Sequence, residues 1–458
     1  MGQLTNRPAP ETRARAGNVG FRRRFSLPPS RGTTATRDPT PGRHGRNEDD
    51  SGAGLARLSR IHGGSMITTR HIVRAPLALV AGALLACADG PERLSRPSEA
   101  QASATKFWEV TASTRWNRRV AGFVALRPPA NGQAATSRIL TYLSLAQYRA
   151  VLAAEDGKVR STHPSVSAAV AAASATVLSR FFPNDATALE DTLAADLAEQ
   201  PWPGAKHQDV ASGEAIGRAI GAEVNALAAT DNYLVTSAGS PPPGDGYWVS
   251  AATGIVRSLH GARPFFLTSA DQLRPPPPPE FGSPDYLAAL AEVRAISDTR
   301  TPDQLALAQF WNTSVPPFTA GALNLIADDL IEQHHRTERE AARILAYANA
   351  AAFDAQIACF DAKFEYWFIR PSQADRAITL PIGLPNHPSF PSAHSCITSA
   401  IMTVLADALP SERSRLENII ELAGTSRIYG GIHYRFDVEA GQDIGRAAAE
   451  LALDGSLR

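Results

Sequence analysis

Residues 363–371 read Lys-Phe-Glu-Tyr-Trp-Phe-Ile-Arg-Pro, directly after a long alanine-rich segment. A helix that persists to Ile369 would place Lys363 and Arg370 seven residues apart, on one face and two turns from each other. Pro371 would end that helix. Two converging cations suit a tetrahedral oxyanion, because arginine offers a planar fork of donors and lysine a point charge. Taken alone, however, the two cations are explained better as part of a solvent-exposed basic helix face than as an anion site.

Residues 387–394 read His-Pro-Ser-Phe-Pro-Ser-Ala-His, and the apolar stretch Cys396–Leu409 follows them. A serine just before such a stretch predicts that a helix begins after Ser392. The first amides of that helix and the positive end of its dipole would favour an anion in front of them. Ser392 would cap the helix or bind the anion. A plain cap beside an incidental histidine explains this stretch equally well.

Residues 426–437 read Ser-Arg-Ile-Tyr-Gly-Gly-Ile-His-Tyr-Arg-Phe-Asp. The two glycines permit a sharp turn, which lets Arg427 and His433 project toward one place. Asp437 follows His433 by four residues, which is one helical turn if a helix begins there. Its carboxylate could then hold Nδ1–H of His433 and leave Nε2 free as a nucleophile. A purely structural histidine–aspartate pair is the alternative for this stretch alone.

Together the three stretches form one pattern. It reads Lys-x6-Arg-Pro, then Pro-Ser-x-His after nineteen residues, then Ser-Arg-x5-His-x3-Asp after thirty-one more. Over about residues 320–450 the chain resembles the phosphatidic acid phosphatase type 2 / vanadium haloperoxidase superfamily, in particular its soluble bacterial branch. The resemblance implies an enzyme with an all-α fold, a helical bundle of the kind found in that superfamily.

The resemblance also implies roles for individual residues. His433 would attack phosphorus to give a phosphohistidine, or would ligate vanadium if vanadate is bound. His394 would act as general acid toward the leaving oxygen, or as acid–base toward peroxide, and Asp437 would orient His433. Phosphate or vanadate would be held by three cations and a helix start, namely Lys363, Arg370, Arg427, Ser392 and the amide of Ala393. The family usually has glycine at position 393, so the added methyl group could crowd the anion.

Two activities are open at this site. A phosphatase would hydrolyse a small phosphomonoester without a cofactor. A haloperoxidase would need vanadate and would oxidise halide with hydrogen peroxide. His387 favours the haloperoxidase, because similar bromoperoxidases have a histidine there, although a histidine in a loop is more often incidental. We favour the phosphatase. A non-enzymatic anion-binding protein is less favoured, since binding alone does not need His394 as a proton donor.

Upstream of these stretches the pattern is helical from about residue 101, without the alternating runs typical of strands. Apolar residues recur at three- and four-residue spacing in Ser137–Glu155, Ser165–Phe182, Asp185–Gln200, Val210–Ala229, Pro284–Ser297 and Pro302–Phe310. The sequence Thr337-Glu-Arg-Glu predicts a capping box that opens the helix leading to Lys363. We divide the body into an N-terminal helical part, 89–310, and a catalytic helical core, 311–458. No later helix is apolar over membrane length, so no transmembrane bundle is expected.

The front of the chain has a different composition. Residues 1–65 are rich in Arg, Gly, Pro, Ser and Thr, which is typical of a disordered tail. Residues 66–88 combine basic residues, a short apolar run and Ala-Cys-Ala, and they predict an export signal with translation starting at Met66. Cys87 would become a lipidated N-terminus that anchors the protein to a membrane, or would be cleaved off. A buried helix of a cytoplasmic protein is the alternative, but we expect an exported protein that is periplasmic, envelope-anchored or secreted.

The charge balance and the cysteines exclude some partners and sites. The formal net charge is zero, and the tail's twelve arginines against five acids leave the rest of the chain with seven more acids than bases. Nothing therefore favours nucleic acid, and the expected partners are small molecules. Three cysteines are too few for a disulfide framework and show no zinc-binding spacing. Cys359 and Cys396 could pair in an oxidising compartment, although buried free thiols are common.

Overall fold

Helices make up nearly all the regular structure in the described part of the chain. The computed structural model describes residues 111–130, 132–157, 163–199, 208–233, 239–250, 259, 261–313 and 316–457. These residues belong to one unit that spans Glu99–Arg458. The predicted tail and the export segment with Met66 and Cys87 lie outside the described residues. The predicted division of the body at residue 310 stays a prediction.

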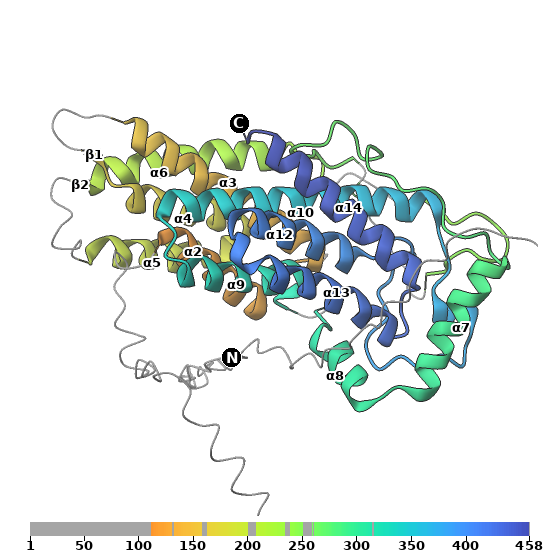
Figure 1. The fold of residues 1–458 in the computed structure, drawn as a ribbon. Coiled ribbons are helices and arrows are strands. Elements are labelled where there is room, and N and C mark those ends of the chain that lie inside the picture. The colour runs from red at the N-terminus through yellow and green to blue at the C-terminus, as the bar shows by residue number, and fades with distance from the viewer. Residues whose placement is uncertain are drawn as a thin grey trace, which may run out of the picture. The chain divides into compact units, whose positions relative to one another are not determined.

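Most helices follow one another with short connections, but residues 230–283 separate α6 from α7 and residues 375–392 separate α11 from α12. In the described part of the chain one parallel pair of two-residue strands, β1 (His163–Pro164) and β2 (Gln208–Asp209), joins the N-terminal helices. The described helices are α2 (Ala112–Leu126), α3 (Gly132–Asp156), α4 (Val166–Phe181), α5 (Ala186–Ala198), α6 (Val210–Ala229), α7 (Pro284–Thr299), α8 (Pro302–Phe310), α9 (Phe318–Gln333), α10 (Glu338–Tyr366), α11 (Pro371–Ala374), α12 (Ala393–Ala408), α13 (Arg413–Tyr429) and α14 (Arg435–Asp454), with 3-10 turns at Pro183–Asp185 and Pro410–Glu412 (Figure 1). The predicted all-α fold is confirmed. Each of the six helical segments expected upstream is found within a few residues of its predicted bounds.

The helices that carry the predicted site residues pack against one another. The long helix α10 contacts α3, α12 and α14, and α12 also contacts α13 (Figure 1). The capping box predicted for the start of α10 is present, because the Thr337 hydroxyl accepts from the Glu340 amide while the Glu340 carboxylate accepts from the Thr337 amide. α10 therefore begins where the sequence indicates and delivers Lys363 to the interior.

The end of α10 differs from the prediction. The helix stops at Tyr366, and Trp367 adopts a left-handed conformation with φ of 50°. The expected continuation to Ile369 is therefore wrong. The reason is tertiary, since the Trp248 amide donates to the Trp367 carbonyl at 2.6 Å and the Ile369 amide donates to the Gly246 carbonyl at 2.9 Å. Arg370 consequently lies outside α10, as the N-cap of α11, and the next residue begins a short helix instead of ending a long one.

α6 approaches α4 unusually closely because small residues line their contact. Gly213, Gly217 and Gly221 lie one turn apart on α6, and a Cβ at each would meet α4 or the residue that caps it. A Cβ built at Gly217 would lie only 2.1 Å from the carbonyl oxygen of Ala169. The two backbones are thus in direct contact at this point, and only glycine fits between them.

We expect Gly217→Ala to lower the free energy of unfolding by about 1–3 kcal/mol, because the two helix backbones must separate to admit the methyl group. Urea or thermal unfolding measures the change. Gly122→Ala on α2 is the matched control, since a Cβ there meets nothing within 4 Å. That control should be neutral or stabilising by up to about 1 kcal/mol through helix propensity. Equal stability of Gly217→Ala and the wild type would contradict the close packing.

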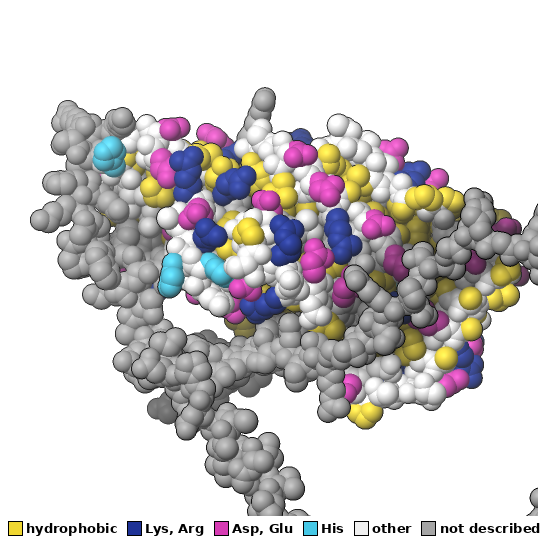
Figure 2. All heavy atoms as spheres, in the orientation of Figure 1, with side chains coloured by type: hydrophobic (Ala, Val, Ile, Leu, Met, Phe, Trp, Pro, Cys, Tyr) yellow, Lys and Arg dark blue, Asp and Glu magenta, His cyan; other side chains and the backbone are white. Residues whose placement is uncertain are grey.

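The surface carries charges of both signs. On the face shown in Figure 2, Lys and Arg side chains alternate with Asp and Glu side chains and form no continuous patch of one sign. Within the described ranges, no helix combines the length and apolar character that crossing a membrane requires.

Candidate active site

The three stretches picked out in the sequence meet in the protein interior. The eight residues predicted to bind the anion or act in catalysis come from α10, α12, α13, α14 and the loops beside them. None is more than 6% exposed, and the set comprises Lys363, Arg370, Ser392, Ala393, His394, Arg427, His433 and Asp437. Tertiary folding thus brings every one of them into the same region.

His433 lies in the turn between α13 and α14, where Gly431 takes a φ of +73°. Its Nδ1 lies 2.8 Å from Oδ2 of Asp437 in the first turn of α14. The same oxygen accepts from the Tyr434 amide at 3.1 Å and from the Ser389 hydroxyl at 2.5 Å. The predicted pairing of His433 with Asp437 is therefore present in the structure. Ser389 was not singled out, because nothing in its spacing marks it as a partner of the carboxylate.

The proton of His433 lies on Nδ1. Arg370 Nη1 is 3.0 Å from Nε2 of His433, and a guanidinium can only donate, so Nε2 accepts that hydrogen bond. Burial, followed by the positive charges of Arg370 and Lys363, lowers the pKa of His433 well below its usual value. Burial raises the pKa of Asp437 to about 6, so the carboxylate is ionised at neutral pH. The result is a neutral imidazole that has a lone pair on Nε2 and a carboxylate behind it.

Arg370 links two histidines and two backbone carbonyls. Besides His433, its guanidinium donates to the carbonyl of Ile432 at 2.6 Å, to the carbonyl of His387 at 3.1 Å and to Nδ1 of His387 at 3.1 Å. Burial lowers its pKa, but an arginine side chain keeps its proton at physiological pH. Arg370 therefore fixes the position of the His433 ring.

Lys363 has a different environment from the one expected. Its ammonium donates to the carbonyls of Pro388 and Ser389, at 2.8 Å each, and to that of Pro391. These bonds hold the loop that leads into Ser392. The lysine thus positions the start of α12, and its predicted contact with the anion stays a prediction.

Arg427 is the cation with spare donor capacity. Its Nε donates to the Ser426 hydroxyl at 3.0 Å and its Nη2 to the carbonyl of Ala308 at 3.2 Å. Its Nη1 is buried and has no hydrogen-bond partner among the described residues. Burial lowers the pKa of this guanidinium as well. A donor held in the interior without a partner favours an added acceptor group.

The charges of the site do not cancel. Lys363, Arg370 and Arg427 are fully buried, while Asp437 is the one carboxylate among the eight site residues. Within the described ranges, none of these three cations forms an ion pair with a carboxylate. Buried charge without compensation is costly, so the cluster favours a bound anion. Phosphate and vanadate fit this donor set, since both present several oxygens to the cations and to Nη1 of Arg427.

The start of α12 matches the predicted helix start. Ser392 is its N-cap and accepts with Oγ from the Ser395 amide at 3.4 Å, while its carbonyl accepts from the Cys396 amide at 3.0 Å. The amides of Ala393 and His394 come first in the helix and have no acceptor within it. Ser392 therefore caps the helix, and the two first amides are the groups suited to an anion.

His394 is tied to a relay of hydroxyl groups. Its Nε2 lies 3.0 Å from Oγ1 of Thr313, which in turn lies 2.8 Å from Oγ1 of Thr319, and that hydroxyl donates to Oε1 of Gln133 at 3.0 Å. Burial, followed by the charge of Arg427, lowers the pKa of His394 well below its usual value. Thr313 was missed in the sequence because 81 residues separate it from His394, and no local pattern spans that distance.

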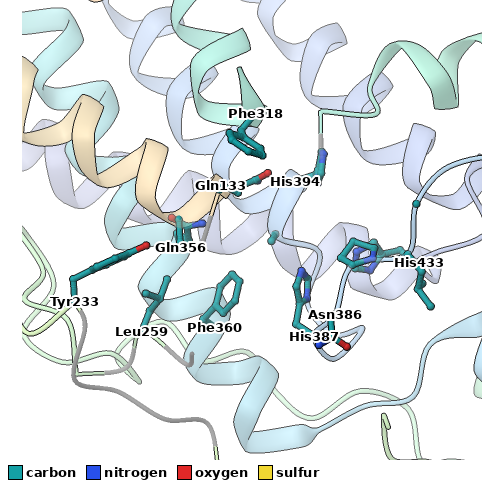
Figure 3. Close-up of a pocket in the computed structure, with 16 residues that line it drawn as sticks. Gln133, Tyr233, Leu259, Phe318, Gln356, Phe360, Asn386, His387, His394 and His433 are labelled. Atoms are coloured by element: carbon teal, nitrogen blue, oxygen red, sulfur yellow. The ribbon is translucent and has the colours of Figure 1, made fainter. Parts of the chain in front are cut away.

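Ala393, His394 and His433 border one cavity of about 490 Å³, whereas the other five site residues, Lys363, Arg370, Ser392, Arg427 and Asp437, are not among the described residues that line it. In Figure 3, His387 and His433 lie toward one end of it, Tyr233 and Leu259 toward the other, and Phe360 lies between them. The described residues that line it are Gly132, Gln133, Ala134, Tyr233, Leu259, Phe318, Gln356, Phe360, Gly383, Leu384, Pro385, Asn386, His387, Ala393, His394 and His433. His387, predicted on the halide or peroxide side, thus faces the same space as the two catalytic candidates.

Comparison with known proteins agrees with this geometry. Residues 340–454 match the sequence model of the PAP2 superfamily. This region belongs to the PAP2 superfamily. It contains all eight of the predicted site residues, which confirms the resemblance drawn from the three motifs. No curated protein sequence matches the chain.

Solved structures extend the likeness beyond the PAP2 region. A bacterial vanadium-dependent iodoperoxidase superposes with a TM-score of 0.64 at 21% identity, over 75% of this chain and 96% of that one. A bacterial vanadium-dependent chloroperoxidase gives a TM-score of 0.57 at 15% identity in its apo form, over 70% of this chain and 92% of that one. Its holo form gives 0.56 at 15% identity, over 72% and 93%. At these identities the comparison shows that the fold is shared.

Two further thiols lie within the PAP2 region. Cys359 and Cys396 are free and buried, on α10 and α12. The Sγ atom of Cys359 lies 3.8 Å from the carbonyl oxygen of Pro391. The disulfide that the sequence allowed is not formed in this structure.

We expect the predicted anion binding near Lys363 to depend on pH. Burial lowers the pKa of Lys363 to about 8. Lysine is charged below its pKa, so its attraction and its three hydrogen bonds are present at lower pH and are lost as the pH rises through 8. We expect the affinity for sulfate, whose charge is constant here, to fall at least about fivefold between roughly pH 6 and pH 10. Calorimetric titration measures it, and an unchanged affinity would contradict the prediction.

Proposed function

We propose that the protein is a phosphomonoester hydrolase that works through a phosphohistidine at His433. The supporting observation is the hydrogen bonding of this residue, with Nδ1–H on Asp437 and Nε2 facing Arg370 at the edge of the cavity. In the structure the lone pair on Nε2 accepts from Arg370, so a phosphoryl group must take the place of that hydrogen bond before Nε2 can attack, and the carboxylate then stabilises the positive charge that attack creates.

In the first step, Nε2 of His433 attacks phosphorus while the bond from phosphorus to the leaving oxygen breaks. The cations Arg370 and Arg427 stabilise the charge on the equatorial oxygens, together with the first amides of α12. His394 donates a proton to the leaving oxygen, which departs as an alcohol. A substrate dianion beside His394 offsets the cations that depress its pKa, so that this residue can carry that proton.

In the second step, water attacks the phosphohistidine and the bond between phosphorus and Nε2 breaks. His394, now neutral, accepts a proton from the water, and inorganic phosphate leaves. Both histidines return to their starting protonation states. The reaction needs no cofactor, because electrons and protons balance within the site residues, water and substrate.

A second candidate, a vanadate-dependent haloperoxidase, uses the same residues. His433 Nε2 would ligate vanadium, and the three cations with the α12 amides would hold the vanadate oxygens. When bound, vanadate would supply activation of hydrogen peroxide toward halide. Two observations favour this candidate, namely the position of His387 on the cavity and a fold shared along nearly the whole length of a bacterial iodoperoxidase.

One experiment separates the two candidates. The purified protein, prepared without vanadate, is assayed for hydrolysis of p-nitrophenyl phosphate and for bromide and iodide oxidation by hydrogen peroxide, each with and without added vanadate. Hydrolysis that vanadate inhibits, without halide oxidation, is the result expected for the phosphatase. Vanadate-dependent halide oxidation without hydrolysis would replace the proposal by the haloperoxidase. Inactivity in both assays would leave an anion-binding protein.

Export is a separate proposal that rests on the sequence of residues 66–88 alone. A protein that starts at Met66 and is processed at Cys87 would act outside the cytoplasm on small phosphoesters, either anchored by lipid or released. Intact-mass analysis of the protein purified from its own envelope tests this. A mass that includes the residues from Met1 onward would contradict it.

A further inference from the structure

The cavity extends well beyond the residues that handle the anion. Phosphate, with five heavy atoms, fills only a small part of 490 Å³, a volume in the range of about 300–1,000 Å³ that is usual for organic ligands. The end away from His433 is lined by Gln356, Phe360, Tyr233 and Leu259 (Figure 3). This part of the cavity has no role in the steps described for phosphoryl transfer.

Gln356 is the unusual residue in this lining. Its side chain is fully buried, and neither Oε1 nor Nε2 has a hydrogen-bond partner among the described residues. By contrast Asn349, seven residues earlier on α10, forms hydrogen bonds with Asn324 and with the carbonyl of Leu345. An unmet buried polar group costs about 1–3 kcal/mol, so an apolar side chain would suit mere packing better. The free donor and acceptor of Gln356 therefore point to a ligand.

The helix sets Gln356 in register with the anion site. Gln356, Phe360 and Lys363 are spaced by four and three residues, so they share one face of α10. Gln356 and Phe360 line the cavity, and Lys363 holds the loop at the start of α12. A group bound against Gln356 is thus at the far end of a molecule whose phosphoryl group is near His433.

The lining also limits the charge and shape of that group. Among the described residues that border the cavity there is no Asp, Glu, Lys or Arg, and the described polar groups near Gln356 are uncharged. Phe360 and Leu259 offer apolar and aromatic surface beside the amide. A glutamine amide presents one acceptor and a pair of donors, which match an amide edge in the opposite direction. The ligand group that matches this part of the cavity is therefore neutral and flat and carries such an amide edge.

We propose that this end of the cavity is a leaving-group subsite for a neutral aromatic or heteroaromatic ring that carries a carboxamide or lactam edge, recognised by Gln356. The inference rests on the proposed anion site at His433. It deepens that proposal by naming the class of alcohol that the phosphomonoester carries. The ring lies against Phe360, and its amide edge satisfies both polar atoms of Gln356.

Binding of stable phosphonates tests the subsite independently of turnover. Calorimetry compares phenylphosphonate with 3- and 4-carbamoylphenylphosphonate on the full-length wild type, Gln356→Leu and Gln356→Met. The wild type should bind one carbamoyl compound roughly tenfold more tightly than phenylphosphonate, as two hydrogen bonds to an otherwise unpaired amide predict. In both Gln356 variants this preference should fall below about twofold. Gln333→Leu, the same change at an exposed position of α9, should keep it.

Thermal unfolding adds a readout that a structural role would not produce. Gln356→Leu should melt no lower than the wild type, because it removes two unmet polar atoms. A wild type without the preference, or variants that retain it, would overturn the subsite while leaving the anion site intact. If phenylphosphonate itself does not bind the wild type, the anion site fails and the subsite fails with it.

Discussion

Replacing His433 with alanine should lower phosphomonoester hydrolysis by about 10⁴-fold or more, because the variant has no nucleophile and the remaining groups only bind and polarise the substrate. The imidazole is also the group that Arg370 and Asp437 position through both of its nitrogens. Initial rates with p-nitrophenyl phosphate measure the loss. The affinity for phosphate should change far less than the rate, since the cations remain in place.

Controls separate this catalytic effect from unfolding. Circular dichroism should show the wild-type helical content in His433→Ala, and the exposed His163→Ala should keep full activity. A phosphohistidine should be detectable by mass spectrometry of rapidly quenched wild type and absent from His433→Ala. An active His433→Ala enzyme would disprove the assignment of the nucleophile.

Asp437→Asn should reduce kcat by about 10²–10⁴-fold while KM changes little. This is expected for a residue that orients the nucleophilic imidazole and stabilises the positive charge forming on it, without touching substrate. The carboxylate accepts the proton of Nδ1 and so leaves Nε2 with its lone pair. An asparagine can instead donate to Nδ1, which shifts the ring proton to Nε2 and blocks attack. Ser389 and the Tyr434 amide donate to the same oxygen, so an asparagine whose amide nitrogen faces Nδ1 loses both of these bonds. An asparagine that keeps its oxygen there retains them but lacks the negative charge that stabilises the imidazolium.

Steady-state kinetics and NMR of the imidazole nitrogens check this prediction. The nitrogen shifts should report Nδ1–H in the wild type and an increased share of Nε2–H in Asp437→Asn. Asp443→Asn, an exposed substitution on the same helix, serves as the matched control and should keep wild-type rates. A fall in affinity with an unchanged kcat would mean that Asp437 acts through substrate binding instead.

The sequence predicted best those features whose partners lie within one or two helical turns. The capping box of Thr337 with Glu340, the N-cap at Ser392 and the pairing of His433 with Asp437 each join residues three or four apart. Such contacts depend on backbone geometry that is the same in every helix. The motifs that contain them were also enough to indicate the all-α fold and the superfamily.

Contacts between distant segments were not predictable in this way. No local pattern indicates that residues 246–248 pair with 367–369 and end α10, so the sequence-based prediction placed Arg370 on the wrong element. It also could not show that Lys363 holds a loop through three carbonyls, because carbonyl positions depend on the path of that loop.

The sequence by itself thus determined the helices, their caps and the identity of the residues that carry the proposed chemistry. Tertiary structure alone decided which atoms of those residues meet, as in Arg370 with Nε2 of His433 or Thr313 with His394, and it placed Gln356 unpaired beside a cavity. The physical reason is the distance along the chain over which each kind of interaction acts. Helix formation and capping are set by neighbours along the chain, whereas charge compensation and cavity shape arise from the packing of all the helices together.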